Sequence, residues 1–313
     1  MLDITHRAKL VDQSVLSPST RWFRFESVSA ELPFEPGQFY RLTMQDSRGT
    51  FERSFSFSQT DLLLPKNQFE LVVSAVAGGR ATNWLFNADL GAEVTLQGPY
   101  GRLLLPEPPA QKLLLIATSV GLAPFLPMLA RLQAQSPEHP RLVHLRLGVR
   151  SPDEFLYEAY LTALHQQYSW FDLSLFYSRQ MPEQPDPWAY SGYVTEGLSA
   201  ETLDAATDRV LVCGNPKMVD DVYQILRSKG FGPKTVVREK YVFAAQSVPQ
   251  NPRRVPLLML LCYRKRLNST RPNKGTRSRP VYPENASATA HRQILGHCLL
   301  VAHAKAKFAC IFR

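Results

Sequence analysis

Hydrophobic and polar residues alternate in short runs through the first part of the chain. The alternation predicts strands at residues 21–26, 38–44, 51–58, 69–76 and 93–97, with a short helix at 81–87. Turn sequences such as Glu35-Pro36-Gly37 separate these runs. Short strands joined by turns are typical of a small antiparallel barrel, which we expect from residue 10 to about residue 105.

The pattern changes after the proline-rich residues 106–109. Residues 112–117 are a continuous apolar run, as in a parallel strand with both faces covered. Further strands are predicted at 143–148, 172–177 and 209–213, and helices at 124–135, 153–167 and 217–229. Strands that alternate with helices predict a doubly wound parallel sheet that binds a nucleotide. We therefore expect a β-barrel domain at 1–105, an α/β domain at 106–243 and a tail at 244–313.

The positive charge of the chain is concentrated in the tail. The formal net charge is +9, but residues 1–243 carry 23 basic and 26 acidic side chains, whereas residues 244–313 carry 13 and 1. The tail also lacks a helix or strand period, which is typical of a disordered segment. The remainder is mildly acidic and gives no indication of a nucleic-acid or membrane surface.

Cysteine use and the N-terminal residues bear on the compartment. Cys213 is the single cysteine before the tail, too few for a disulfide, a zinc site or an iron–sulfur cluster. Residues 1–10 contain no apolar signal-peptide core, and the longest apolar run, 255–263, is too short to span a membrane. We expect a soluble, cytoplasmic protein without a metal, for which a monomer suffices.

The run Arg53-Ser54-Phe55-Ser56-Phe57 combines side chains that suit a flavin. In a strand, Arg53, Phe55 and Phe57 share one face and the serines share the other. An arginine can hold a phosphate, an aromatic ring can pack on a flavin, and a hydroxyl can bond to a ring nitrogen. Alone, the run is better explained as an ordinary strand with aromatic side chains in the core. Motifs further along the chain change that interpretation.

Two glycine-containing segments suit anions. In Gly78-Gly79-Arg80-Ala81-Thr82-Asn83, a glycine turn opens a short helix, whose first backbone N–H groups are free to bind an anion. Thr118-Ser119-Val120-Gly121-Leu122-Ala123-Pro124 follows the first strand of the second domain. A strand, a loop of small residues and a helix start form a pyrophosphate cradle.

In this order the motifs resemble those of the ferredoxin–NADP reductase superfamily, in which a flavin-binding β-barrel precedes a pyridine-nucleotide domain. The resemblance covers residues from about 5 to 243. Arg53-Ser54-Phe55-Ser56 resembles the family's Arg-x-Tyr-Ser motif, with Phe55 where tyrosine is usual. The resemblance implies that Arg53 binds a phosphate of FAD, that Phe55 packs on the isoalloxazine, and that Ser56 bonds near N5. Ser54 belongs to the same flavin-binding motif.

The two glycine segments resemble the family's second flavin-phosphate motif and its Gly-Thr-Gly-x-Ala-Pro nucleotide loop. In the nucleotide loop, Ser119 and Val120 depart from the usual residues. The resemblance implies FAD contacts from Arg80, Ala81 and Thr82. It implies nucleotide contacts from Thr118, Val120 and Gly121.

Two arginines stand at predicted strand ends, in Gly148-Val149-Arg150 and Ser178-Arg179. In this family, arginines at such places grip the 2′-phosphate of NADP, and two parallel charge-assisted hydrogen bonds suit a guanidinium for that task. The resemblance therefore implies nucleotide contacts from Val149, Arg150, Ser178 and Arg179, and it favours NADP.

NAD stays open as an alternative. Asp153 and Glu154 are close in sequence to Arg150, and a carboxylate binds the ribose hydroxyls in many NAD sites. In addition, Tyr193 follows Gly192 where some relatives carry a further arginine.

Cys213-Gly214-Asn215-Pro216-Lys217-Met218 matches the family's Cys-Gly-x-Pro-x-Met motif. The match implies that Cys213 lies near the nicotinamide C4, with Gly214 and Met218 also in contact with the cofactor. No motif pairs a base with Cys213, so a covalent nucleophile is not expected. Glu239-Lys240-Tyr241 resembles the family's final segment, whose aromatic residue covers the flavin. Ser56, Cys213 and Tyr241 are thus the expected catalytic residues.

We predict an FAD-containing reductase that takes hydride from NADPH and passes single electrons to a separate ferredoxin or flavodoxin. Alternatives within the enzyme class are an NAD(P)H–flavin reductase and the reductase component of an oxygenase. An alternative of another class is a non-catalytic nucleotide-sensing scaffold, whose basic tail binds an acidic partner. The full set of flavin and nicotinamide motifs favours the enzyme.

Overall fold

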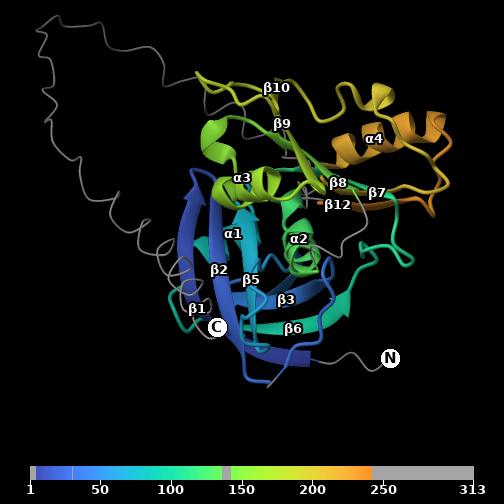
Figure 1. Cartoon of the computed structure of the whole chain (residues 1–313). Coiled ribbons are helices and arrows are strands. Elements are labelled where there is room, and N and C mark those ends of the chain that lie inside the picture. The colour runs from blue at the N-terminus through green and yellow to red at the C-terminus, as the bar shows by residue number, and fades with distance from the viewer. Residues whose placement is uncertain (1–4, 30, 136–141, 242–313) are drawn as a thin grey trace, which may run out of the picture. The chain divides into compact units, whose positions relative to one another are not determined.

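The computed structural model describes residues 5–29, 31–135 and 142–241, which contain two sheets (Figure 1). The tail predicted at 244–313 lies outside the described residues. The elements of the first sheet region are β1 (Thr5–Ser17), β2 (Thr20–Ser27), β3 (Phe39–Asp46), β4 (Gly49–Ser56), β5 (Gln68–Ser74), α1 (Arg80–Phe86) and β6 (Glu93–Tyr100). The six strands pair antiparallel in the order β4-β3-β6-β1-β2-β5.

Stacked aromatic rings fill the core of the first sheet. Phe57, directly after β4, stacks on Tyr40 of β3 with ring centroids 5.0 Å apart and on Phe69 of β5 at 4.6 Å. The two outermost strands of the sheet meet nearby, where Ser58 donates its backbone N–H to the carbonyl of Glu70 at 2.9 Å. The sheet thereby curls toward the predicted barrel, and the end of β4 lies beside the first half of β5.

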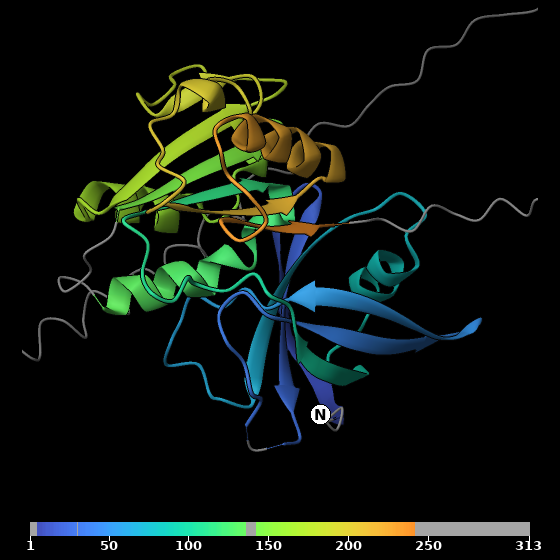
Figure 2. The same cartoon turned by 90° about the vertical axis from the view of Figure 1, so that its right-hand side faces the viewer.

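The second sheet is parallel. Its region contains β7 (Lys112–Thr118), η1 (Ser119–Leu122), α2 (Phe125–Ala134), β8 (Leu142–Val149), η2 (Pro152–Glu154), α3 (Glu158–Gln167), β9 (Phe171–Tyr177), β10 (Ala189–Ser191), η3 (Leu198–Ala200), β11 (Arg209–Gly214), α4 (Pro216–Ser228) and β12 (Val236–Lys240). The strand order is β10-β9-β8-β7-β11-β12, and Figure 2 shows helices on both faces. The predicted fold class, an antiparallel flavin-domain sheet followed by a parallel α/β domain, is confirmed.

Several elements differ from the sequence prediction. The strands β1, β10 and β12 were not predicted; in β1 the alternation is hidden because the polar His6 points inward and is buried. The helix predicted at 153–167 begins only at Glu158. The 3₁₀ turn η2 and Tyr157, whose φ of +57° is left-handed, occupy its predicted first turn. Within the described residues, no helix is long and apolar enough to cross a membrane.

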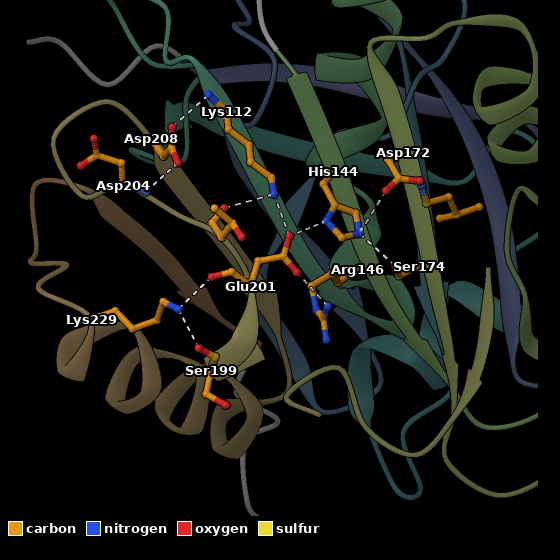
Figure 3. A network of polar contacts seen from close by, with 12 residues as sticks. Lys112, His144, Arg146, Asp172, Ser174, Ser199, Glu201, Asp204, Asp208 and Lys229 are labelled. Atoms are coloured by element: carbon orange, nitrogen blue, oxygen red, sulfur yellow. Dashed lines mark hydrogen bonds and ion pairs between the residues drawn. The ribbon is translucent and has the colours of Figure 1, made fainter. Parts of the chain in front are cut away.

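Polar contacts hold the connection between β9 and β11 against the sheet (Figure 3). Residues 178–208 contain β10 and η3 but no α-helix, although doubly wound folds usually cover this face with one. Glu201 lies at the centre of the contacts, and three basic groups of β7 and β8 surround it. Its carboxylate lies 2.7 Å from Lys112 Nζ, 3.1 Å from His144 Nδ1 and 3.3 Å from Arg146 Nη1.

Arg146 also bonds directly to the backbone of the connection between β9 and β11. Its Nε donates to the carbonyl of Val194 at 3.1 Å, and Nη2 donates to the carbonyl of Glu196. Its guanidinium also packs over the Phe176 ring, 4.6 Å from the centroid. The hydrogen bond from His144 and the Lys112 ammonium hold the pKa of Glu201 at about 2. The buried charges are therefore paired, which is the condition for their tolerance in a protein interior.

The Glu201 contacts make stability depend on pH. The folded pKa of Glu201 is depressed, so its contribution is complete above the ordinary carboxyl pKa and is lost as pH falls toward 2. We expect Glu201→Gln to lower the free energy of unfolding by about 3 kcal/mol at pH 7. The difference from wild type should shrink between pH 4.5 and pH 2, measured by chemical denaturation. The exposed Glu183→Gln is the matched control, and an equal loss there would contradict the assignment.

Candidate active site

Ser56, Cys213 and Tyr241, the three residues expected to be catalytic, come together in space. Ser56 is the last residue of β4, and Cys213 is the penultimate residue of β11. Tyr241 follows β12, and its backbone N–H donates to the carbonyl of Gly214 at 2.9 Å. Its hydroxyl donates to Ser56 Oγ at 3.0 Å and also lies within hydrogen-bonding reach of the Cys213 thiol. One tyrosine thus links the last residues of strands from both sheets.

The Cys213 thiol remains protonated at neutral pH. The residue is fully buried, and burial, together with the negative charge of Glu239, raises the pKa of the thiol well above its ordinary value. The thiolate is the nucleophilic form of cysteine. The protonated thiol is a poor nucleophile, and the expectation that Cys213 is not a covalent nucleophile stays a prediction.

Glu239 is a neighbour of this cluster that the sequence prediction missed. Burial raises the pKa of its carboxyl to about 7, and its charge acts on both Cys213 and Tyr241. Its Oε1 would lie 3.2 Å from a Cβ placed on Gly101. Glu239 precedes Tyr241 by two positions, so the period of a strand would have placed both on one face.

The first two residues of the β4 motif face solvent, whereas Ser56 is buried. Arg53 and Ser54 are exposed, while Phe55 is half-buried against the aromatic core. Arg53 Nη1 donates to the backbone carbonyl of Glu52 at 2.7 Å, and no carboxylate among the described residues pairs with it. An exposed guanidinium without an acidic partner fits a phosphate, and a half-buried ring beside it fits an isoalloxazine. These side chains therefore fit FAD.

The polar side chains at the start of α1, those of Arg80 and Thr82, form hydrogen bonds with other residues of the protein. Arg80 makes a two-pronged ion pair with Asp46, Nε to Oδ2 at 2.8 Å, and donates to the carbonyl of Gly49 at 2.7 Å. The guanidinium holds the pKa of the Asp46 carboxyl well below its usual range. Thr82 is buried with Ala81, and its hydroxyl donates to the carbonyl of Gly79 at 3.1 Å. Arg80 thus ties α1 to the β3–β4 hairpin, and the expected FAD contacts from residues 80–82 stay predictions.

The nucleotide loop and the end of β11 touch backbone to backbone. A Cβ on Gly121 would lie 2.3 Å from the carbonyl oxygen of Cys213, and one on Gly214 would lie 2.4 Å from Thr118 Oγ1. Gly214 also has a φ of +135°, which favours glycine. Thr118 Oγ1 in turn accepts from the N–H of Asn215 at 3.1 Å. This close approach brings the residues expected at the nicotinamide end together, with buried Val120 and Met218 adjoining.

The predicted phosphate-binding residues also lie side by side. The carbonyl of Val149 accepts from Ser178, from its N–H at 3.0 Å and from its hydroxyl at 3.1 Å. The N–H of Arg179 donates to the carbonyl of Arg150 at 3.0 Å. Both arginines are exposed, and neither has an acidic partner within the part of the chain that the structure describes. Two exposed arginines on hydrogen-bonded backbone segments fit a doubly charged phosphate.

The carboxylates that kept NAD open have other partners. Asp153 accepts from the hydroxyl of Ser151, and Glu154 accepts from two serine hydroxyls of the first sheet. Tyr193 is 66% exposed after Gly192 and offers a ring instead of a charge. Glu154 is thus engaged by the first sheet, whereas Asp153 is exposed and accepts only a local bond.

Family models match both parts of the chain. The oxidoreductase FAD-binding domain matches residues 7–104, and the oxidoreductase NAD-binding domain matches residues 115–224. The chain is thus an oxidoreductase with binding domains for FAD and for NAD(P). The superfamily to which the chain belongs follows from its similarity to characterised relatives.

The toluate 1,2-dioxygenase electron transfer component of Pseudomonas putida is 31% identical over 242 residues, which are 77% of this chain and 68% of the relative. Ferredoxin–NADP reductase B of Sorangium cellulosum is 29% identical over 75% of this chain and 96% of the relative. The chain belongs to the ferredoxin–NADP reductase-like superfamily. It spans 60% of the 2-halobenzoate 1,2-dioxygenase electron transfer component of Burkholderia cepacia.

Solved structures agree with this fold. The crystal structure of an Amycolatopsis cytochrome P450 reductase superposes with a TM-score of 0.65 and 25% identity over 76% of this chain and 69% of the other. A ferredoxin NADP⁺ reductase from Neisseria gonorrhoeae, solved with FAD and NADP, superposes with a TM-score of 0.64 and 23% identity. The superposition covers 75% of this chain and 98% of the Neisseria reductase.

The raised pKa of Glu239 predicts a pH-dependent cost of folding. The cost is absent below the ordinary carboxyl pKa of 4.5, where Glu239 is protonated in both states, and it is complete above about 7. Glu239→Gln removes the charge at every pH. The variant should therefore gain stability relative to wild type on going from pH 5 to pH 8, measured by chemical denaturation. A gain that is equal at both pH values would contradict the burial of a titrating carboxyl.

Proposed function

We propose that this protein is an FAD-dependent reductase that takes hydride from NADPH and passes electrons singly to a separate protein. The observation that carries the proposal is the meeting of Ser56, Cys213 and Tyr241, which come from both domains. When bound, FAD supplies the conversion of a two-electron donor into one-electron steps. The side chains of the protein orient the cofactors and set the electrostatic environment around them.

Ser56 is placed to bond to a flavin ring nitrogen. Its Oγ accepts from the Tyr241 hydroxyl, so the serine proton remains available to a second acceptor. Tyr241 fixes the orientation of this hydroxyl, and its ring covers the flavin position until nicotinamide enters. Cys213 contributes a small neutral group, because its burial keeps the thiol protonated.

The electron acceptor is a ferredoxin or flavodoxin in this proposal. A second candidate is the oxygenase component of a two-component system. The similarity to the toluate 1,2-dioxygenase electron transfer component favours it. Kinetics with NADPH against ferredoxins, flavodoxins and an oxygenase component would separate the two.

The first test is the flavin itself. The purified protein should be yellow, release FAD on denaturation and oxidise NADPH with an artificial acceptor. Ser56→Ala should lower the rate of flavin reduction about 10- to 100-fold, since one hydrogen bond to the reacting ring is lost. Thr50→Ala, an exposed hydroxyl on the same strand, is the control. A colourless, inactive protein would overturn the proposal and favour a nucleotide-sensing scaffold.

The second test is nucleotide choice. Arg150→Ala and Arg179→Ala should each raise the KM for NADPH about tenfold or more, because each removes a charge-assisted hydrogen bond to the 2′-phosphate. The KM for NADH should change little. Arg227→Ala, an exposed arginine on α4, controls for net charge. Equal effects on both nucleotides would show that the arginines do not read the 2′-phosphate.

A further inference from the structure

Glu154 bonds the nucleotide domain to the first sheet. It is the last residue of η2, between β8 and α3. Its Oε2 accepts from Ser17 Oγ and from Ser19 Oγ, each at 2.9 Å. Ser17 is the last residue of β1 and is buried, and Ser19 lies in the turn between β1 and β2. One carboxylate oxygen therefore grips the tip of the β1–β2 hairpin through charge-assisted hydrogen bonds, which are stronger than neutral ones.

Tyr157 touches the first sheet at a second point. It adopts the left-handed φ of +57° immediately before α3, an uncommon conformation for a residue with a Cβ. Its hydroxyl is buried beside Ser58, just after β4, and Glu70, near the start of β5, and burial raises its pKa. Such a conformation persists only where the surroundings hold it. Residues 152–157, which we name the clasp, thus contact the first sheet at two separated places.

The contacts around the clasp are continuous with the core. Trp22 and Val72 of the first sheet pack into the hydrophobic cluster of the parallel sheet. Ser74 of β5 lies between the two domains, with its Oγ 2.7 Å from Thr20 and 3.4 Å from Ser119 of the nucleotide loop. Ser58, which Tyr157 contacts, follows Ser56 by two residues. The clasp therefore contacts the first sheet next to the end of β4, and Ser74 of the same sheet contacts the loop after β7.

We propose that Glu154, through Ser17 and Ser19, is a positioning residue that fixes the nucleotide domain against the flavin domain, and that it does not bind the ribose of NAD. The consequence for hydride transfer rests on the proposed function. Hydride transfer requires the two reacting atoms within a narrow distance, and a misplacement of about 1 Å costs about 100-fold in rate. Loosening the clasp should therefore slow the step with either nucleotide, while nucleotide binding stays the same.

Variants on each side of the contact test the proposal. Single-turnover reduction of the flavin, followed at increasing NADPH and NADH, separates the limiting rate from the dissociation constant. Glu154→Ala and the double variant Ser17→Ala/Ser19→Ala should each lower the limiting rate 5- to 50-fold with both nucleotides, with dissociation constants within about twofold of wild type. Combining all three changes should cost no more than either alone, because one contact is lost in each case.

Glu154→Gln and a neighbouring carboxylate provide the controls. The glutamine keeps an acceptor oxygen, so it should recover part of the rate lost in Glu154→Ala. Asp153→Asn changes the adjacent carboxylate, which accepts only a local bond from Ser151, and should leave both rates unchanged. If Glu154→Ala fails to fold, Glu154→Gln and the serine variants still decide the question. A selective weakening of NADH binding would overturn the proposal and identify Glu154 as a ribose ligand.

Hydrogen–deuterium exchange gives a readout that does not depend on catalysis. Glu154→Ala should raise exchange in residues 17–22 and 152–157, while Asp153→Asn should not. Unchanged exchange with unchanged rates would refute the clasp. If neither NADPH nor NADH reduces the flavin of the wild-type protein, the proposed function is refuted and the clasp is not. The exchange experiment then still decides whether Glu154 holds the two domains together.

Discussion

The hydrogen bond between Tyr241 and Ser56, 3.0 Å long, is the contact on which the candidate active site depends. It is made by the residue that ends the first sheet's outermost strand and by the residue that follows the last strand of the parallel sheet. Neither sheet contains the site by itself. The geometry at this point is therefore set by every interaction that holds one domain on the other, and not by the local sequence of either motif. The bonds of the clasp to the first sheet are such interactions, as is the packing of Trp22 and Val72 into the cluster of the parallel sheet.

Two partly buried carboxylates show how differently a charge can be accommodated. Glu201 is surrounded by Lys112, His144 and Arg146, so its ionised form is favoured and its pKa falls to about 2. Glu239 has no comparable ion-pair partner among the described residues, so burial favours the protonated form and its pKa rises to about 7. The first arrangement is typical of structural support. The second is typical of functional sites, where shifted pKa values collect.

Most of the fold could be predicted from the sequence because the strands of the parallel sheet are apolar on both faces. The run at β7 is a clear case, since residues 113–117 are all buried. The strand β1 was harder, because His6 interrupts the alternation that marks a half-buried strand. The meeting of Ser56 with Cys213 followed from the family resemblance and not from periodicity. Contacts between distant positions, such as Arg80 with Asp46, leave no local pattern and needed the structure.

The backbone contact between Gly121 and Gly214 limits how this protein can be redesigned. A single methyl group on either glycine would collide with main-chain or Thr118 atoms at 2.3–2.4 Å. Main-chain atoms cannot turn aside as a side chain does, so a larger residue would push two strands apart. Under the proposed function, room for a bulkier nicotinamide analogue cannot be gained in this loop by substitution. The room has to come from Tyr241, whose side chain can be shortened without moving the backbone.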